Sequence, residues 1–281
     1  MHLHSSVLVA LAALFAGNAR AGVVQRNVAN SAVKNVVVFG DSFSDNGNGS
    51  YRITNSTWPA DPAYYDGRFS NGPVWVEDVA SKLKLTLHDF AVGGSTSDNH
   101  LTQGYTGFNS TILVPSALDQ LSMYLGGVKA NANLGDTLFI ILTGANDAFF
   151  DANATGADTA KAVVTIIEKL RKRGYIDAAT AAQLHKWSIE FRAEMKALAA
   201  SQVTYVDLYA LFSELFANPR QYGYDPAEIT KSCLTGAYGE APRSLCSDPD
   251  EYIFWDEYHP TTKTHRFIAA AAEEALLHTL Q

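Results

Sequence analysis

The sequence predicts an α/β protein in which a mostly parallel sheet is covered by helices on both faces. Apolar runs of strand length alternate along the chain with longer stretches of helical periodicity. The runs at 35–39 and 137–142 are apolar almost throughout, which is typical of strands buried on both faces. The 281 residues are 47% hydrophobic and 18% charged, enough for a large core. We find no internal repeat or linker and expect one domain over residues 22–281.

The N-terminal residues 1–21 have the pattern of a secretory signal peptide. Residues 7–17 form an apolar run that is too short to cross a bilayer, and the small-residue site Ala19-Arg20-Ala21 follows it. The first residues carry His2 and His4 in place of a firm positive charge, and the alternative interpretation is a short buried helix. A leader predicts a secreted protein. No later segment has the length and apolar character of a membrane anchor.

Two further patterns agree with export. Cys233 and Cys246 can close one disulfide loop in an oxidising compartment, and a zinc site is the poorer interpretation because neither cysteine has a second ligand at metal-binding spacing. We therefore expect no metal and no cofactor. Four triplets have the form of glycosylation acceptors, at Asn48, Asn55, Asn109 and Asn153.

The charge of the chain excludes some partners. Lysine and arginine number 21 and acidic residues 29, a net charge of −8. This balance argues against nucleic acid and anionic membrane surfaces as partners. A nucleotide-binding protein is also disfavoured, because no G-x-G-x-x-G or P-loop pattern follows any expected strand.

The elements of the first half surround a long polar segment. After the strand at 35–39, residues 41–71 are rich in Gly, Asn, Ser and aromatic residues and lack a helical period. We expect this segment to be a surface excursion that carries part of a binding site. A helix begins near Pro73, and a strand around 83–87 leads into a glycine turn at 90–95.

The second half continues the alternation and ends in a long helix. We expect, in order, a helix at 114–124, a strand at 137–142, helices at 159–173 and 178–200, a strand at 203–208 followed by a helix, the disulfide loop, a short strand at 252–255, and a helix at 261–280.

A serine, a histidine and an aspartate suggest nucleophilic chemistry. Ser42 follows the first strand in a Gly-Asp-Ser turn, and the carboxyl ends of parallel strands are where such sheets carry their chemistry. Taken alone, Ser42 is as well explained as a helix cap. His259, with Asp256 three residues before it, can supply the base and the group that orients the base. Taken alone, His259 is better explained as a capping residue before Pro260 and the last helix, but the presence of Ser42 favours the catalytic interpretation.

The intermediate of acyl transfer also needs hydrogen-bond donors for its oxyanion. The backbone N–H groups of Ser42 and of Gly94, which lies in the turn after the second strand, are candidates. The side chain of Asn146, after the third strand, is another. The alternatives are an ordinary turn glycine and an Asx-turn residue.

Together, these residues resemble the four blocks of the GDSL, or SGNH, hydrolase family. The blocks are Gly40-Asp41-Ser42-Phe43-Ser44-Asp45, Phe90-Ala91-Val92-Gly93-Gly94, Gly144-Ala145-Asn146-Asp147 and Asp256-Glu257-Tyr258-His259-Pro260. The resemblance implies a flavodoxin-like three-layer α/β/α sandwich. It also implies Ser42 as nucleophile, Asp256 and His259 as its triad partners, and an oxyanion hole formed by Ser42, Gly94 and Asn146. Phe43 replaces the leucine of the family name.

Residues around these blocks are expected to have structural roles. We expect Asp41 and Asp147 to hold turns, residues 64–73 to form a wall of the cleft, and His265 to be a packing residue. The cluster Asp248, Asp250 and Glu251 lacks the glycine and spacing of a calcium loop. Six aromatic residues are candidates for a substrate groove or for core: Tyr51, Trp58, Tyr64, Tyr65, Phe149 and Phe150.

The sequence thus predicts a secreted, cofactor-free serine esterase. The absence of a large apolar lid and of a basic patch favours short acyl esters, and members with this pattern often act on acetylated carbohydrates. Two alternatives remain open. One is a lipase or phospholipase with longer acyl chains, and the other is a non-catalytic glycan-binding protein on the same fold.

Overall fold

A five-stranded parallel sheet forms the centre of the protein. The computed structural model describes residues 8–12, 33–107, 109–128, 136–172 and 203–279. The strands are β1 (Leu8–Ala12), β2 (Asn35–Gly40), β3 (Thr86–Asp89), β4 (Thr137–Thr143) and β5 (Val203–Tyr205), in the order β3-β2-β4-β1-β5. Every pair of neighbours in this sheet is parallel. The predicted α/β class and the mostly parallel sheet are confirmed.

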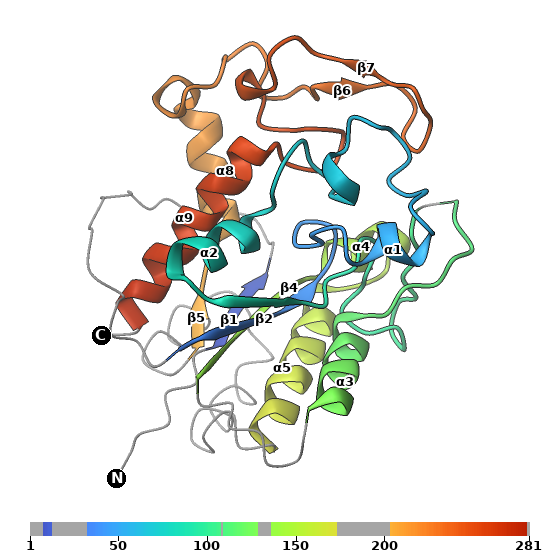
Figure 1. Cartoon of the computed structure of the whole chain (residues 1–281), viewed down its shortest axis with the longest axis vertical. Coiled ribbons are helices and arrows are strands. Elements are labelled where there is room, and N and C mark those ends of the chain that lie inside the picture. Colours follow the sequence, from blue (N-terminus) through green and yellow to red (C-terminus); the bar gives the residue numbers. More distant parts are fainter. Residues whose placement is uncertain (1–7, 13–32, 108, 129–135, 173–202, 280–281) are drawn as a thin grey trace.

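Helices cover both faces of this sheet and make three layers (Figure 1). On one face lie α3 (Ala117–Gly127) and α5 (Gly156–Lys172); on the other lie α2 (Trp75–Leu83), α8 (Leu208–Ala217) and α9 (Thr262–Thr279). Alternate side chains of β2 enter the two layers. Val36 and Val38 belong to the core under α2 and α9, whereas Val37 and Phe39 belong to the core under α3 and α5. The sandwich is the one that the family resemblance implies.

The observed helices begin at their capping residues, which differ from the starts predicted by the hydrophobic period. The helix expected at 114–124 begins at Ala117, because the Ser116 hydroxyl accepts a hydrogen bond from the Asp119 N–H at 3.2 Å. It continues through the glycine pair that was expected to end it. In the same way, Asp207 caps α8 through the Ala210 N–H, so β5 ends at Tyr205, earlier than predicted. The helix expected at 178–200 lies outside the described residues.

The excursion after β2 is tied down by one carboxylate. It contains the short helices α1 (Ser50–Ile53) and η2 (Tyr65–Gly67). Asp45, fully buried, accepts hydrogen bonds from the N–H groups of Gly47 and Gly49 at 3.0 Å and from those of Ser50 and Gly93 at 2.8 Å. Asp45 therefore joins the excursion to the glycine turn after β3.

The prediction of a strand at 252–255 is wrong. Phe254 forms only isolated bridges, to Ser232 and to Pro260. The Cys233 N–H donates to the Phe254 carbonyl and the Trp255 N–H to the His259 carbonyl. This segment is therefore held by neighbouring loops and does not join the sheet. Its apolar side chains fill a satellite core, which explains why the run resembles a strand.

The predicted disulfide between Cys233 and Cys246 is present. It closes a loop that carries a small antiparallel pair, β6 (Leu234–Thr235) and β7 (Ser244–Leu245). The remaining short helices are α4 (Ala145–Phe150), η4 (Pro219–Tyr222) and η5 (Pro249–Glu251). Among the described residues, no helix combines the length and the apolar character that crossing a membrane requires.

The N-terminal strand bears on the predicted signal peptide. β1 lies within residues 1–21 and pairs with both β4 and β5. A leader that is removed on export takes β1 out of the sheet, so a cleaved chain and a five-stranded sheet exclude each other. The cleavage site at 19–21 lies outside the described residues, and the signal peptide stays a prediction.

Candidate active site

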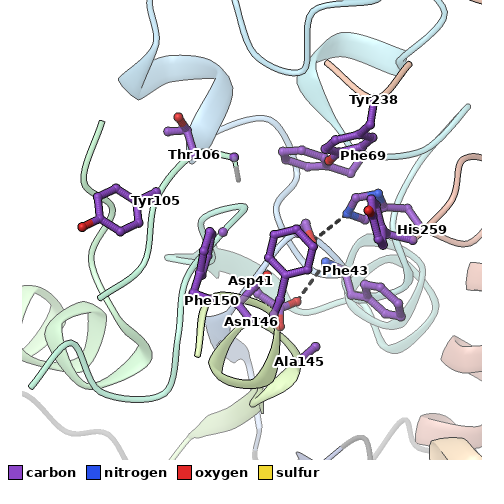
Figure 2. Close-up of a pocket in the computed structure, with 15 residues that line it drawn as sticks. Asp41, Phe43, Phe69, Tyr105, Thr106, Ala145, Asn146, Phe150, Tyr238 and His259 are labelled. Carbon is purple, nitrogen blue, oxygen red and sulfur yellow. Dashed lines mark hydrogen bonds between the residues drawn. The ribbon is translucent and has the colours of Figure 1, made fainter. Parts of the chain in front are cut away.

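Three sheet-end turns meet at one cavity. Ser42 follows β2, Gly94 follows β3 and Asn146 follows β4, and these strands are neighbours in the sheet. Parallel neighbours end at the same edge, so their turns are adjacent. All three residues line a cavity of about 190 Å³, together with His259 (Figure 2).

Ser42, His259 and Asp256 form a hydrogen-bonded chain. His259 Nε2 lies 2.9 Å from Ser42 Oγ, and His259 Nδ1 lies 2.8 Å from both carboxylate oxygens of Asp256. All three are buried, with Ser42 8% and His259 5% exposed. The imidazole therefore has a carboxylate on one ring nitrogen and a hydroxyl on the other, which is the arrangement that lets a serine lose its proton to a base.

Asp256 is buried and still held as a carboxylate. The N–H groups of Tyr258 and His259 donate to its Oδ1 at 2.8 Å, and the hydroxyl of Tyr64 donates to its Oδ2 at 2.6 Å. Burial raises the pKa of Asp256, but the adjacent His259 and these donated bonds outweigh burial, and the net pKa is lowered from its ordinary value. The group facing the histidine is thus negatively charged at neutral pH.

The oxyanion candidates face the same space. Gly94 has φ +87°, and a Cβ there would collide with the Tyr105 carbonyl, so this turn requires glycine. The Asn146 Nδ2 donates to the Ser95 carbonyl at 2.9 Å, which orients the amide and leaves its second N–H for another acceptor. In the described part of the chain, no backbone hydrogen bond is made by the amide of Ser42 or of Gly94.

A buried glutamine holds the end of β2. Gln120, on α3, accepts from the Gly40 N–H at 2.8 Å and donates to the Gly40 carbonyl at 2.9 Å. Its amide nitrogen also donates to the Ser95 hydroxyl at 2.9 Å, so Gln120 joins the β2 turn to the β3 turn. The sequence pattern does not reveal the role of Gln120, because a polar residue within an amphipathic helix is typical of the exposed face.

The aspartates beside the motif residues hold their turns, as expected. Asp41 Oδ1 accepts from the Phe43 N–H at 3.1 Å, and Asp147 accepts from both the N–H and the hydroxyl of Ser97. Burial raises the pKa of Asp41 to about 7, against the opposing effect of the bond from Phe43. Asp41 therefore carries a proton over part of the neutral range.

The cavity wall is aromatic and comes from distant segments. Of the six aromatic candidates for groove or core, Phe149 and Phe150 line the cavity. Phe69 supports the prediction that residues 64–73 form a wall, with its ring centroid 5.0 Å from that of His259. Tyr238, inside the disulfide loop, stacks on His259 at 6.3 Å and was missed. Other expected groove residues lie elsewhere: Trp58 packs edge-on against Tyr238, and Tyr64 bonds Asp256.

The remaining candidates fall outside the cavity. His265 is buried on α9 against Phe43, where burial lowers its pKa to about 3 and keeps it neutral. The cluster around Asp250 is exposed, and within the described ranges no group of three metal-binding side chains is found. The four acceptor asparagines, Asn48, Asn55, Asn109 and Asn153, are all exposed.

Comparison with known proteins gives consistent matches. The model of the GDSL-like lipase/acylhydrolase family matches residues 36–272. The thermolabile hemolysin of Vibrio parahaemolyticus is 31% identical over 272 residues, which cover 84% of this chain and 62% of the hemolysin. A phosphatidylcholine-sterol acyltransferase of Aeromonas hydrophila is 25% identical, covering 90% of this chain and 92% of that protein. A GDSL esterase/lipase of Arabidopsis thaliana is 23% identical, covering 85% and 79%.

Proposed function

The chain belongs to the GDSL-like lipase/acylhydrolase family and is an ester-hydrolysing serine hydrolase; on that basis we propose that it removes short acyl groups from carbohydrates outside the cell. Ser42 is the proposed nucleophile, with His259 as base and Asp256 as the group that orients it. The observation that carries this assignment is the chain of contacts at 2.9 Å and 2.8 Å through the His259 ring.

Acylation uses the histidine first as a base. Ser42 Oγ attacks the acyl carbonyl carbon as its proton passes to His259 Nε2, and the carbonyl electron pair moves to the oxygen. The N–H groups of Ser42 and Gly94 and the side chain of Asn146 are the proposed donors to that oxyanion. When the intermediate collapses, the bond to the alcohol breaks and His259 returns the proton to the leaving oxygen.

Deacylation repeats these steps with water. Water attacks the acyl-enzyme carbonyl, His259 takes its proton, and the ester bond to Ser42 breaks as His259 protonates Oγ. The acid is released and the starting state returns. Asp256 stays ionised throughout, which fits its lowered pKa.

The size and lining of the cavity support a small acyl group. A volume of about 190 Å³ is below the range of roughly 300–1,000 Å³ that encloses drug-sized ligands. The aromatic rings of Phe69, Tyr238 and Tyr258 lie around His259, where the leaving alcohol departs. Such rings suit the apolar faces of sugars.

A second candidate function is acyl transfer or hydrolysis on lipids with longer chains. The observation that favours it is that two relatives are a hemolysin and a phosphatidylcholine-sterol acyltransferase. The phenylalanines Phe149 and Phe150 supply apolar surface for a chain that extends out of the cavity.

One substrate panel separates these functions. We expect 4-nitrophenyl acetate and acetylated xylo-oligosaccharide to be hydrolysed with higher kcat/KM than 4-nitrophenyl decanoate and phosphatidylcholine vesicles. A peak at long chains contradicts the short-acyl proposal and supports the lipid candidate. Unchanged hydrolysis by Ser42→Ala removes Ser42 from the mechanism, and binding of the oligosaccharide without any hydrolysis favours the glycan-binding alternative.

Secretion is part of the proposal and rests on the leader pattern, the exposed acceptor asparagines and the disulfide. We also propose a single domain over residues 22–281. The mass of the N-terminal peptide, from protein recovered from the medium of a secreting eukaryotic host and deglycosylated, tests secretion and where the mature chain starts. A start near residue 22 supports export with cleavage, whereas retention of residues 1–21 leaves β1 available to the sheet and contradicts the leader.

A further inference from the structure

The disulfide loop reaches the candidate catalytic aspartate through two side chains. Arg243, inside the loop, donates from a terminal guanidinium nitrogen to the hydroxyl of Tyr64 at 3.2 Å. That hydroxyl in turn donates to Asp256 Oδ2 at 2.6 Å. The excursion that carries Tyr64 therefore meets two neighbouring segments near the other end of the chain, in one chain of hydrogen bonds that ends at the group orienting His259.

Arg243 is firmly anchored for this contact. Its side chain is 1% exposed, and its other terminal nitrogen donates to the carbonyls of Leu234 and Gly236 at 3.1 and 3.2 Å and to Glu257 at 2.6 Å. Its backbone N–H donates to Asp61 Oδ2 at 2.6 Å. An arginine held at this many points has little freedom to leave Tyr64.

The loop itself is attached next to Asp256. The Cys233 N–H donates to the Phe254 carbonyl at 3.1 Å, and the Leu234 N–H donates to the Trp255 carbonyl at 2.7 Å. The disulfide then fixes the far end of the loop at Cys246. The loop is therefore bonded directly to the segment that leads into Asp256, and Arg243 bridges this region to the excursion containing Tyr64.

We propose that Tyr64 and Arg243 are positioning residues for the reaction: Arg243 orients the Tyr64 hydroxyl, and Tyr64 fixes the Asp256 carboxylate that aligns His259. The inference rests on the proposed roles of Ser42, His259 and Asp256 and names a further pair that acts through them. Tyr64 is suited to this role because its hydroxyl stays protonated. Burial, together with the Asp256 charge, raises its pKa.

The sign of the expected pH effect follows from the bond that is lost. A donor on Asp256 lowers the affinity of that carboxylate for protons, so removing the donor makes Asp256 attract the proton on His259 more strongly. The other titratable and charged groups that face the pair stay in place: Arg243, Tyr238 and Tyr258 around Asp256, and Asp41 and His265 around His259. The acidic limb of the kcat/KM profile therefore moves to higher pH.

The first test is Tyr64→Phe, with Tyr224→Phe as the matched control. Both tyrosines are buried and hydrogen-bonded through the hydroxyl, but Tyr64→Phe loses the bonds to Asp256 and from Arg243, whereas Tyr224→Phe loses the bond to Thr264, away from the cavity. We expect Tyr64→Phe to lower kcat about tenfold, the scale of one hydrogen bond to a charged group. We expect KM to stay within about twofold and the acidic limb to rise by about half a pH unit. Tyr224→Phe should change thermal stability and leave the limb in place. The inference is overturned if the acidic limb of the kcat/KM profile does not shift in Tyr64→Phe, or if it shifts equally in Tyr224→Phe.

The second test is the double-mutant cycle of Tyr64→Phe with Arg243→Lys. Lysine keeps the charge but loses the fork that bonds Tyr64, so Arg243→Lys should lower kcat and shift the limb in the same direction. The double variant should be no worse than about the more impaired single variant, because both act through one chain of bonds. Fully multiplicative losses contradict the inference. Failure of the proposed function is distinguishable, because it appears as hydrolysis by Ser42→Ala regardless of these variants.

Discussion

The two sides of the cavity are built differently. On one side, Ser42, Gly94 and Asn146 stand on turns that end three neighbouring parallel strands. On the other, Asp256 and His259 lie in a segment without regular strand or helix, held by the disulfide loop and by side-chain hydrogen bonds.

The difference separates two ways of positioning a reacting group. The sheet side, which carries Ser42, Gly94 and Asn146, is positioned by the backbone hydrogen bonds of the sheet and by the cores packed on both of its faces. The histidine side, which carries Asp256 and His259, depends on a few polar contacts between distant segments. One substitution is enough to remove each of these contacts. We therefore expect catalytic rate and stability to be separable on the sheet side, where one substitution changes mainly one of the two, and to fall together on the histidine side.

The largest effect is expected from Asn146→Ala on the sheet side. This variant loses the proposed oxyanion donor, and such a loss costs about 100-fold or more in kcat. The fold should hold, because Asn146 is only half-buried and makes one bond to the Ser95 carbonyl. Kinetics and thermal unfolding measure both quantities. The control is Asn153→Ala, on the exposed loop after α4, which should keep wild-type activity. If Asn146→Ala itself keeps activity within about threefold of wild type, Asn146 is not an oxyanion donor.

An intermediate effect is expected from removing the disulfide in the double variant Cys233→Ala/Cys246→Ala. Opening this loop, whose cysteines are 13 residues apart, costs about 2–4 kcal/mol of unfolding free energy. It also frees the segment that carries Tyr238 and Arg243, so kcat should fall several-fold below the unfolding temperature.

The matched change on the sheet side is Gln120→Leu, which removes the clamp on Gly40. It should cost about 1–3 kcal/mol because the Gly40 N–H loses its acceptor, while the Gly40 carbonyl keeps its bond from the Val92 N–H, and kcat should be nearly unchanged. Equal losses of kcat in the disulfide variant and in Gln120→Leu would break the contrast between the two sides. Urea unfolding and steady-state kinetics supply the data.

The smallest effect on the rate is expected from Asp41→Asn, whose consequence is a change in pH dependence. The pKa of Asp41 is about 7 in the folded protein against an ordinary 3.8. The folded state therefore holds a proton that the unfolded state loses, and this group lowers stability as pH rises from about 4 to 7. Asparagine can still accept from the Phe43 N–H. Between about pH 4 and 7, the free energy of unfolding should fall by about 2–4 kcal/mol less in the variant than in wild type. If the two curves of unfolding free energy against pH are parallel, the raised pKa of Asp41 is contradicted.

The same contrast explains what could be predicted from the sequence. β2 and β4 are continuous apolar runs, and the glycines and polar residues that end them mark the turns of Ser42 and Asn146. These signals are local. Asp256 and His259 were also found, because a carboxylate three residues before a histidine is a local pattern.

The residues that hold Asp256 in place, Tyr64 and Arg243, could not be predicted from local sequence patterns. Tyr64 and Asp256 are 192 residues apart, and Arg243 and Tyr64 are 179 apart. No spacing rule links such residues, and only the folded chain brings them together. The run at 252–255 resembles a strand because it is short and apolar, although Ile253 and Trp255 are buried in satellite clusters and not in the sheet.

Covalent labelling tests the central claim, that Ser42 is the nucleophile activated by His259. Diethyl 4-nitrophenyl phosphate should transfer one diethylphosphoryl group to Ser42 Oγ, with release of 4-nitrophenolate and loss of ester hydrolysis in step with labelling. Peptide mass spectrometry should locate the group on the peptide containing Gly40-Asp41-Ser42, and Ser42→Ala should take up none. Full inhibition with the label on another residue, or label-resistant hydrolysis in Ser42→Ala, would contradict the account.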